Sequence, residues 1–315
     1  MVSSIEPPRL PVIDLSLFDL GDPWRDQVAA QIDAASCEFG CFCLVGHGID
    51  VGVVEPLMAA GRRFFASEDA VKRRRQVEQH ARALQGDFAP IEELSARSSD
   101  LTHLYFEAQL MLSSKSRQPD ASLSRQSFLP DVPGFREPVL DYMRSLTGLS
   151  HKVMAMLARA LRLADSYFVD RYTGSPATSF RILNYPQVAD AHAATASSAL
   201  GHEEPGLLTF LKQDADAGLE LYYKEQWVNL PATPNSFICN VGQALARLTN
   251  GRYVAAAHRT RNSTDTHRLS MSFRFEPTAH ARLEPIAGVG PGVSRSSPAD
   301  AASHAAPLSG YRRLA

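Results

Sequence analysis

The spacing of the hydrophobic positions changes part-way along the chain. In the first half they recur every three or four residues, which is typical of helices with one buried face. This spacing predicts one helix that ends at Gly40, a second that follows it, and a long amphipathic helix after Pro133. The positions expected to face inward are Val28, Ile32, Ala35 and Phe39, then Leu57, Gly61 and Phe64, then Val139, Tyr142, Leu146, Leu149, Val153, Met156 and Ala160.

After about residue 178 the hydrophobic period becomes two, the period of a β-strand. Short strands separated by turn residues are expected at 179–186, 206–213, 218–223, 236–242 and 267–275, with earlier ones at 11–16, 41–49 and 103–110. Such a series is typical of an antiparallel sandwich or a small barrel. The sequence therefore predicts an α+β protein with a mainly β core and flanking helices.

Composition narrows the functional classes. The 315 residues are 44% hydrophobic and carry a net charge of −2, which gives no field that favours nucleic acid or a membrane surface. Four cysteines in a chain of this length do not form a disulfide framework, and no stretch reads as a secretory signal or a membrane span. We expect a cytoplasmic protein with a small-molecule partner, present as a monomer or weak homo-oligomer.

Three residues suited to metal binding stand out in the second half. His202 and Glu204 are two positions apart in "GHEEPGLLTF", so on an extended segment their side chains project to the same side. His258 begins a later strand-like region. Two imidazoles and one carboxylate form the facial triad that suits non-haem Fe(II) and leaves positions open for other ligands. Arg268 and Ser270 share one face of a following strand, where a guanidinium fork and a hydroxyl can anchor a carboxylate.

The order of these residues resembles the iron- and 2-oxoglutarate-dependent oxygenases, in the branch that includes isopenicillin N synthase. The resemblance runs from about residue 10 to 285 and includes the segments "LPVIDLS", "FGCFCLVGHGI", "NYP", "GLLTFLKQD", "WVNLPATPNSFICNVG" and "LTNGRYVAAAHR". It implies a double-stranded β-helix, or jelly roll, with its core at about 178–280 inside a single domain of residues 1–285. Residues 286–315, rich in Gly, Pro, Ala and Ser, are expected to form a mobile tail or a loose cover.

The resemblance also implies roles for single residues. His202, Glu204 and His258 would hold the iron, and Arg268 and Ser270 would bind the distal carboxylate of 2-oxoglutarate, with a further hydrogen bond from Tyr185. The implied reaction uses O2 and 2-oxoglutarate to hydroxylate or desaturate a small organic molecule; only Arg274, discussed below, suggests that this molecule bears a carboxylate. Glu204 departs from the family, which usually has aspartate at this position.

Two other functions remain open from sequence. In an isopenicillin N synthase-like oxidase that uses no 2-oxoglutarate, Arg268 and Ser270 would hold the substrate's own carboxylate. A binding protein that keeps the barrel without turnover is a second alternative. The alternative for Tyr185 is a buried aromatic residue whose hydroxyl is satisfied within the protein.

Arg274 is the candidate substrate-binding residue. In "RLSMSFRF" the polar residues alternate with apolar ones, so a continuous strand would turn Arg274 to the barrel interior, about 20 Å from Arg268 at about 3.3 Å per residue. An arginine in that place favours an anionic group on the substrate. The alternative is that the strand ends or bulges by residue 274 and that Arg274 reaches solvent or pairs with Glu276.

Overall fold

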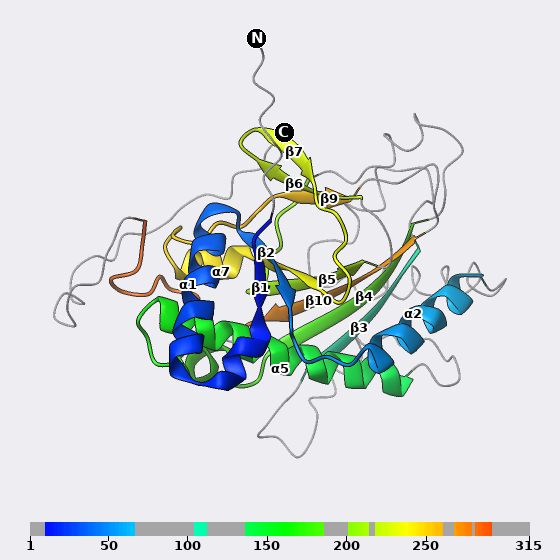
Figure 1. Cartoon of the computed structure of the whole chain (residues 1–315), viewed down its shortest axis with the longest axis horizontal. Helices are drawn as coiled ribbons and strands as arrows, with labels where there is room; N and C mark the ends of the chain where they lie inside the picture. The colour runs from blue at the N-terminus through cyan, green and yellow to red at the C-terminus, as the bar shows by residue number, and fades with distance from the viewer. Residues whose placement is uncertain are drawn as a thin grey trace, which may run out of the picture.

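Two sheets face each other, and helices cover the outer side of the larger sheet (Figure 1). The computed structural model describes residues 10–66, 136–185, 201–213, 218–260, 268–278 and 281–291, and the backbone of 104–111. Expectations for residues 67–103, 112–135, 186–200, 261–267 and 292–315 lie outside the described residues.

The larger sheet has seven strands in the order β1-β2-β8-β5-β10-β4-β3. Their bounds are Val12–Asp14 (β1), Cys41–Val45 (β2), Leu104–Met111 (β3), Ala177–Tyr185 (β4), Leu208–Gln213 (β5), Phe237–Val241 (β8) and Arg268–Glu276 (β10). The pair β1 and β2 is parallel, and every other pair of neighbouring strands in this sheet is antiparallel. β10 is an inner strand of this sheet, because it pairs with β4 on one side and β5 on the other.

The smaller sheet has the order β7-β6-β9, with bounds Gln226–Asn229 (β7), Leu219–Tyr223 (β6) and His258–Thr260 (β9). A compact apolar cluster lies between the sheets and includes Cys43 and Ile238 from the larger sheet and Leu219 and Leu221 from β6. The two sheets thus enclose a common interior, as expected for a jelly roll.

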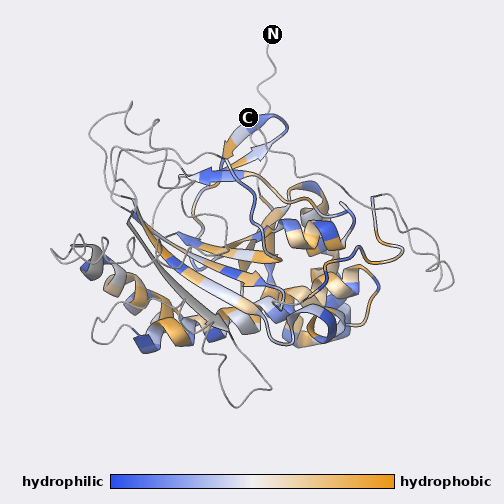
Figure 2. Cartoon of the chain, turned by 180° about the vertical axis from the view of Figure 1, so that it is seen from behind, coloured by the Kyte–Doolittle hydropathy of each residue, from blue (hydrophilic) through white to orange (hydrophobic). Residues whose placement is uncertain are grey.

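Three long helices pack on the outer face of the larger sheet: α1 (Asp22–Glu38), α2 (Val51–Ala66) and α5 (Arg136–Ala160). They follow the predicted helices closely, and α5 buries the whole expected stripe except Ala160, which is only partly buried. The side chain of Phe64 is not among those described. Apolar residues of β10, including Met271 and Phe273, belong to the core that these helices cover. In Figure 2 the strands of this sheet carry hydrophobic and hydrophilic residues along the same length, because opposite faces meet different surroundings.

Several short elements were not predicted. The hydrophobic pattern contains no indication of the 3-10 helix Leu15–Leu20, the π-helix Val169–Thr173 or the six-residue helix α7 (Gln243–Leu248). These elements are too short to show a period, and tertiary contacts decide their conformation.

The expected boundary at residue 285 falls inside a packed segment. Ile286 and Val289 are buried against the main core, and the Ile286 N–H donates to the Leu248 carbonyl. Residues 286–291 therefore belong to the folded unit, because two apolar side chains of this Gly- and Pro-rich sequence pack in the core next to α7. Among the helices that the structure describes, none has the length and hydropathy needed to cross a membrane.

Candidate active site

A backbone bridge joins the two segments that carry the candidate histidines. The His202 N–H donates to the His258 carbonyl and the His258 N–H donates to the His202 carbonyl, both at 3.0 Å. His258 is the first residue of β9, whereas His202 lies in the segment that leads into β5. This reciprocal pair sets two residues far apart in sequence directly opposite each other.

The start of α7 holds the turn that follows Glu204. The Gln243 N–H donates to the Glu204 carbonyl at 2.7 Å, and the Gly242 N–H donates to the Leu207 carbonyl at 2.9 Å. A Cβ on Gly242 would overlap the carbonyl oxygen of Gly206, so this close approach requires glycine. The Gln243 side-chain amide also donates to the Glu203 carboxylate at 3.0 Å. Glu203 is therefore engaged with α7, and its neighbour Glu204 is free to turn inward.

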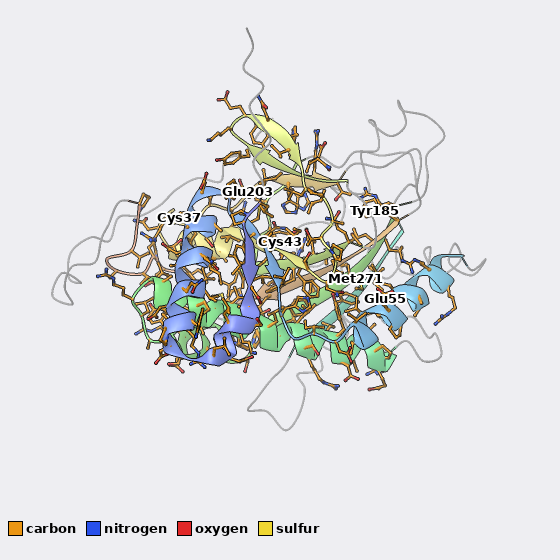
Figure 3. All side chains as sticks on the ribbon, viewed as in Figure 1. Cys37, Cys43, Glu55, Tyr185, Glu203 and Met271 are labelled. Carbon is orange, nitrogen blue, oxygen red and sulfur yellow. The ribbon has the colours of Figure 1, made fainter. Side chains whose placement is uncertain are left out.

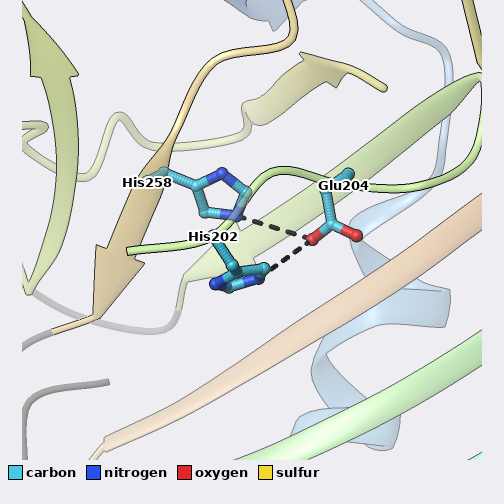
Figure 4. Close-up of side chains that lie close together, drawn as sticks. All are labelled: His202, Glu204 and His258. Carbon is cyan, nitrogen blue, oxygen red and sulfur yellow. Dashed lines mark ion pairs between the residues drawn. The ribbon is translucent and has the colours of Figure 1, made fainter. Parts of the chain in front are cut away.

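Three donor groups converge where these segments meet (Figure 4). One carboxylate oxygen of Glu204, Oε1, lies 3.6 Å from Nε2 of His202 and 3.5 Å from Nε2 of His258. The ligand atoms of the three residues all lie within 4.8 Å of one another. The side chains of Glu204 and His258 are each only 4% exposed, whereas that of His202 is 49% exposed. Two imidazole nitrogens and a carboxylate oxygen form a donor set that fits a divalent transition metal.

Contacts around the cluster fix its ionisation and orientation. Nδ1 of His258 lies 3.2 Å from the Ala256 carbonyl, an arrangement in which Nδ1 carries the proton and Nε2 keeps its lone pair for a metal. Burial alone would raise the pKa of the Glu204 carboxyl. The neighbouring imidazoles of His202 and His258 and the charge of Arg274 outweigh burial and hold that pKa well below its usual range. Glu204 is therefore an ionised, buried carboxylate.

Arg268 and Tyr185 lie directly opposite each other on β10 and β4, at the end of β4 where Figure 3 labels Tyr185. The Arg268 guanidinium carbon is 4.6 Å from the centre of the Tyr185 ring, and Arg268 is only 3% exposed. Ser270 is two residues further along β10, on the same face, opposite Gln213 of β5. The structure thus brings together the three residues that were expected to bind 2-oxoglutarate.

Arg274 turns to the interior, and its contact is with Glu204. β10 continues to Glu276 and pairs at Arg274 with both Ser179 and Thr209, so the alternative of an ended or bulged strand is wrong. Nε of Arg274 lies 2.9 Å from Oε2 of Glu204, a contact that the sequence did not predict. The N–H does not point at the oxygen, so the two groups form an ion pair without a hydrogen bond.

The interior face carries other polar residues that sequence reasoning missed. Arg181 of β4 faces the same side as Arg274, because it pairs with Ser272. Thr209 of β5 lies opposite Arg274, and Asn240 of β8 lies opposite Thr209, so the three residues form one cross-strand row. Thr209 and Asn240 are buried, and the Thr209 hydroxyl and the Asn240 amide nitrogen have no hydrogen-bond partner among the described residues. The sequence does indicate the direction of Arg181, because this residue is four positions before Tyr185 on the same strand and therefore lies on the same face.

Comparison with known families decides what kind of protein carries this site. Residues 171–277 match the 2OG-Fe(II) oxygenase superfamily, and residues 10–126 match the family described as non-haem dioxygenase in morphine synthesis N-terminal. The chain belongs to the 2OG-Fe(II) oxygenase superfamily. The earlier resemblance to the isopenicillin N synthase-like branch is thereby confirmed.

Individual relatives agree with the family models. A probable iron/ascorbate oxidoreductase of Dictyostelium discoideum is 28% identical over 91% of this chain and 86% of its own length. A 2-oxoglutarate-dependent dioxygenase of Monascus ruber is 29% identical over 89% of this chain and 88% of its own. The solved structure of a dioxygenase for auxin oxidation in rice is 26% identical and has a TM-score of 0.63, with 84% of this chain and 82% of that one covered.

The protein is therefore an Fe(II)- and 2-oxoglutarate-dependent dioxygenase with a jelly-roll fold, and it acts on a small molecule. Its metal cofactor is Fe(II), and its cosubstrates are 2-oxoglutarate and O2.

Proposed function

We propose that this oxygenase holds Fe(II) with His202, Glu204 and His258 and binds the distal carboxylate of 2-oxoglutarate with Arg268, Ser270 and Tyr185. The observation that carries the proposal is the convergence of two imidazole Nε2 atoms on one oxygen of a buried carboxylate. Three protein donors on one side of a metal leave its other positions for cosubstrate and O2. Iron held there would supply the redox chemistry that couples O2 and 2-oxoglutarate to oxidation of the substrate.

The chain's own residues orient the reactants. The Ala256 carbonyl keeps the His258 ring in one tautomer, and the backbone bridge keeps His202 opposite it. Stacking on Tyr185 fixes the plane of the Arg268 guanidinium, which favours two-point binding of a carboxylate. The burial of Glu204, His258 and Arg268 excludes water and strengthens each electrostatic contact.

We further propose that the substrate is a small molecule with a carboxylate. Support comes from Arg181 and Arg274, two cations at diagonal positions on neighbouring strands of the interior face. Nε of Arg274 contacts Glu204, and its terminal nitrogens can still meet an anion. The partly exposed side chain of His202 marks a side of the cluster that is open to an incoming molecule.

An anaerobic titration tests the metal and cosubstrate assignment. Fe(II) with 2-oxoglutarate should give the visible charge-transfer band of the chelate in the parent protein. We expect His258→Ala to abolish the band, and His47→Ala, a variant in a turn outside the cluster, to keep it. A band that persists in His258→Ala would show that the iron is held elsewhere.

A succinate assay tests the substrate class. Small carboxylic acids are compared with their methyl esters as stimulators of succinate release. Acids should stimulate more than esters, and Arg181→Ala should remove this preference without changing the concentration of 2-oxoglutarate needed. Equal stimulation by acids and esters would contradict the charge assignment and leave the metal assignment unaffected.

A further inference from the structure

The two oxygens of the Glu204 carboxylate have different neighbours. Oε1 faces Nε2 of both histidines, whereas Oε2 lies 2.9 Å from Nε of Arg274. The Glu204 side chain is 4% exposed and that of Arg274 is 21% exposed, so solvent screens this ion pair only weakly. The carboxylate therefore sits between the histidine pair on one side and a fixed cation on the other.

Both partners of this ion pair are anchored by the backbone. Arg274 belongs to β10, which is hydrogen-bonded to β4 and β5 on its two sides at this position. Glu204 lies in the turn that the first N–H groups of α7 hold. The fold therefore places the two side chains close together, because the backbone of each residue is held by hydrogen bonds.

A glutamate needs such support more than an aspartate does. Its additional methylene adds one rotatable bond, so the carboxylate can swing and can offer a metal one oxygen or both. A cation beside Oε2 favours the orientation in which only Oε1 points to the histidines.

We propose that Arg274 is a positioning residue that holds Oε2 of Glu204 away from the metal, so that this glutamate binds iron through Oε1 alone. The proposal rests on the metal site put forward above and adds a role for a residue outside the triad. It accounts for two features together: a glutamate in the triad and an arginine on the interior face opposite Thr209.

Two effects of Arg274 on metal affinity oppose each other. Its positive charge repels a divalent cation, whereas its contact with Oε2 pre-orients the ligand. Partners that orient a metal ligand commonly change metal affinity by about 10- to 100-fold when removed. Because Glu204 lies between Arg274 and the histidine pair and offsets part of the charge of Arg274, we expect the orienting effect to dominate.

Cobalt(II) titration of the metal-free full chain tests the proposal, with the d–d absorption of the ion as the readout. Arg274→Ala should weaken Co(II) binding by about 10- to 100-fold and change the absorption intensity, because the released carboxylate can use both oxygens. Arg274→Met, which keeps the side-chain length and removes the charge and the donor, should behave in the same way if Arg274→Ala folds poorly. Arg274→Lys, which keeps the charge, should recover part of the affinity.

Arg259→Ala is the matched control. Arg259 directly follows His258 and forms an ion pair with another buried carboxylate, in which its Nε–H donates to Oε2 of Glu220 at 2.6 Å. Its removal should leave Co(II) affinity within about twofold of the parent, the range expected for independent sites. In the Glu204→Asp background, where the carboxylate is too short to reach Arg274, the effect of Arg274→Ala should shrink to the same range.

Unchanged affinity and spectrum in Arg274→Ala and Arg274→Met would overturn the proposal. Tighter Co(II) binding would overturn it as well, because it would show that the charge of Arg274 acts mainly by repulsion. Glu204→Ala and His258→Ala separate this failure from failure of the metal site itself. If these two variants still bind Co(II) like the parent, the metal assignment is wrong; if they lose it while Arg274→Ala does not, only the role of Arg274 is wrong.

Discussion

Arg268 shows how the surroundings of a single side chain determine what it can bind. The residue is buried, it stacks on Tyr185 and its backbone is fixed within a central strand. A guanidinium in such a place presents its fork in one plane, and a lysine ammonium cannot reproduce this geometry. An exposed ion pair such as that of Arg144 with Asp141 contributes little by comparison, because solvent screens it.

Arg268→Lys should therefore raise the KM for 2-oxoglutarate by about 10- to 100-fold, the equivalent of one lost charge-assisted hydrogen bond. Succinate release as a function of 2-oxoglutarate concentration measures the effect, with Arg259→Lys as a control that should leave the KM unchanged. Oxidation at full rate without any 2-oxoacid would instead support an oxidase that takes all its electrons from the substrate.

His47 predicts a pH dependence of stability at the residue scale. Its Nδ1 accepts from the Ile49 N–H at 3.1 Å and its Nε2 lies 3.0 Å from the Asn235 carbonyl, a pattern that needs the neutral ring. Burial lowers the pKa of His47, the nearby charge of Lys212 lowers it further, and the contact with Asn235 only partly opposes them. The unfolded chain therefore binds a proton more readily, and stability is lost as pH falls below about 6.5.

Urea unfolding at pH 7.5 and pH 5.5, with a chelator present to keep metal out, checks this expectation. The free energy of unfolding of the parent should fall between the two pH values by more than that of His47→Gln. Equal losses in the two proteins would show that other groups account for the whole pH dependence.

At the scale of elements, the contact between α7 and the turn 204–207 couples stability to the site. Gly242→Ala should destabilise the fold by about 1–3 kcal/mol, because the added Cβ forces the Gly206 carbonyl to move. The same shift should displace Glu204 and weaken Co(II) binding. Gly148→Ala, on the exposed side of α5 with no atom within 4 Å of the new Cβ, should stabilise by about 0.5–1 kcal/mol.

Chemical denaturation and Co(II) titration of both variants provide the comparison. If Gly242→Ala bound Co(II) as the parent does, the turn would have no part in placing Glu204.

The elements that the sequence predicted well are those in which the hydrophobic period repeats over many residues. The stripe of α5 and the alternation of β10 span many residues, so that burial of one face leaves a clear pattern. α7 has six residues, and no period is visible at that length. The ion pair between Arg274 and Glu204 was missed for another reason: spacing within a strand gives the face of a side chain, but the distance between two elements depends on the complete fold.

At the scale of the whole molecule, the segment after β10 contributes to the main core. Ile286 and Val289 each bury an aliphatic side chain there. A chain that ends after residue 285 should be less stable than one that ends after residue 291, by about 3–6 kcal/mol, because burial of each of the two side chains contributes about 1.5–3 kcal/mol. Urea unfolding of the two truncated proteins measures the difference, since both lack residues 292–315. Equal midpoints would contradict a role of this segment in the core.

The two faces of β10 have a consequence for how this protein can diversify. The apolar side chains on one face pack in the core, and they belong to Leu269, Met271, Phe273 and Phe275. The polar side chains on the other face point to the interior that holds the proposed active site, and they belong to Arg268, Ser270, Ser272 and Arg274. A random library restricted to position 272 would therefore sample new substrates at little cost to folding, whereas a library at position 274 would also disturb the ion pair with Glu204. A library at positions 271 and 273 would mostly sample unfolded chains. Selection can act on the two sets separately although they alternate along one strand, which makes β10 a place where specificity can evolve while the scaffold stays intact.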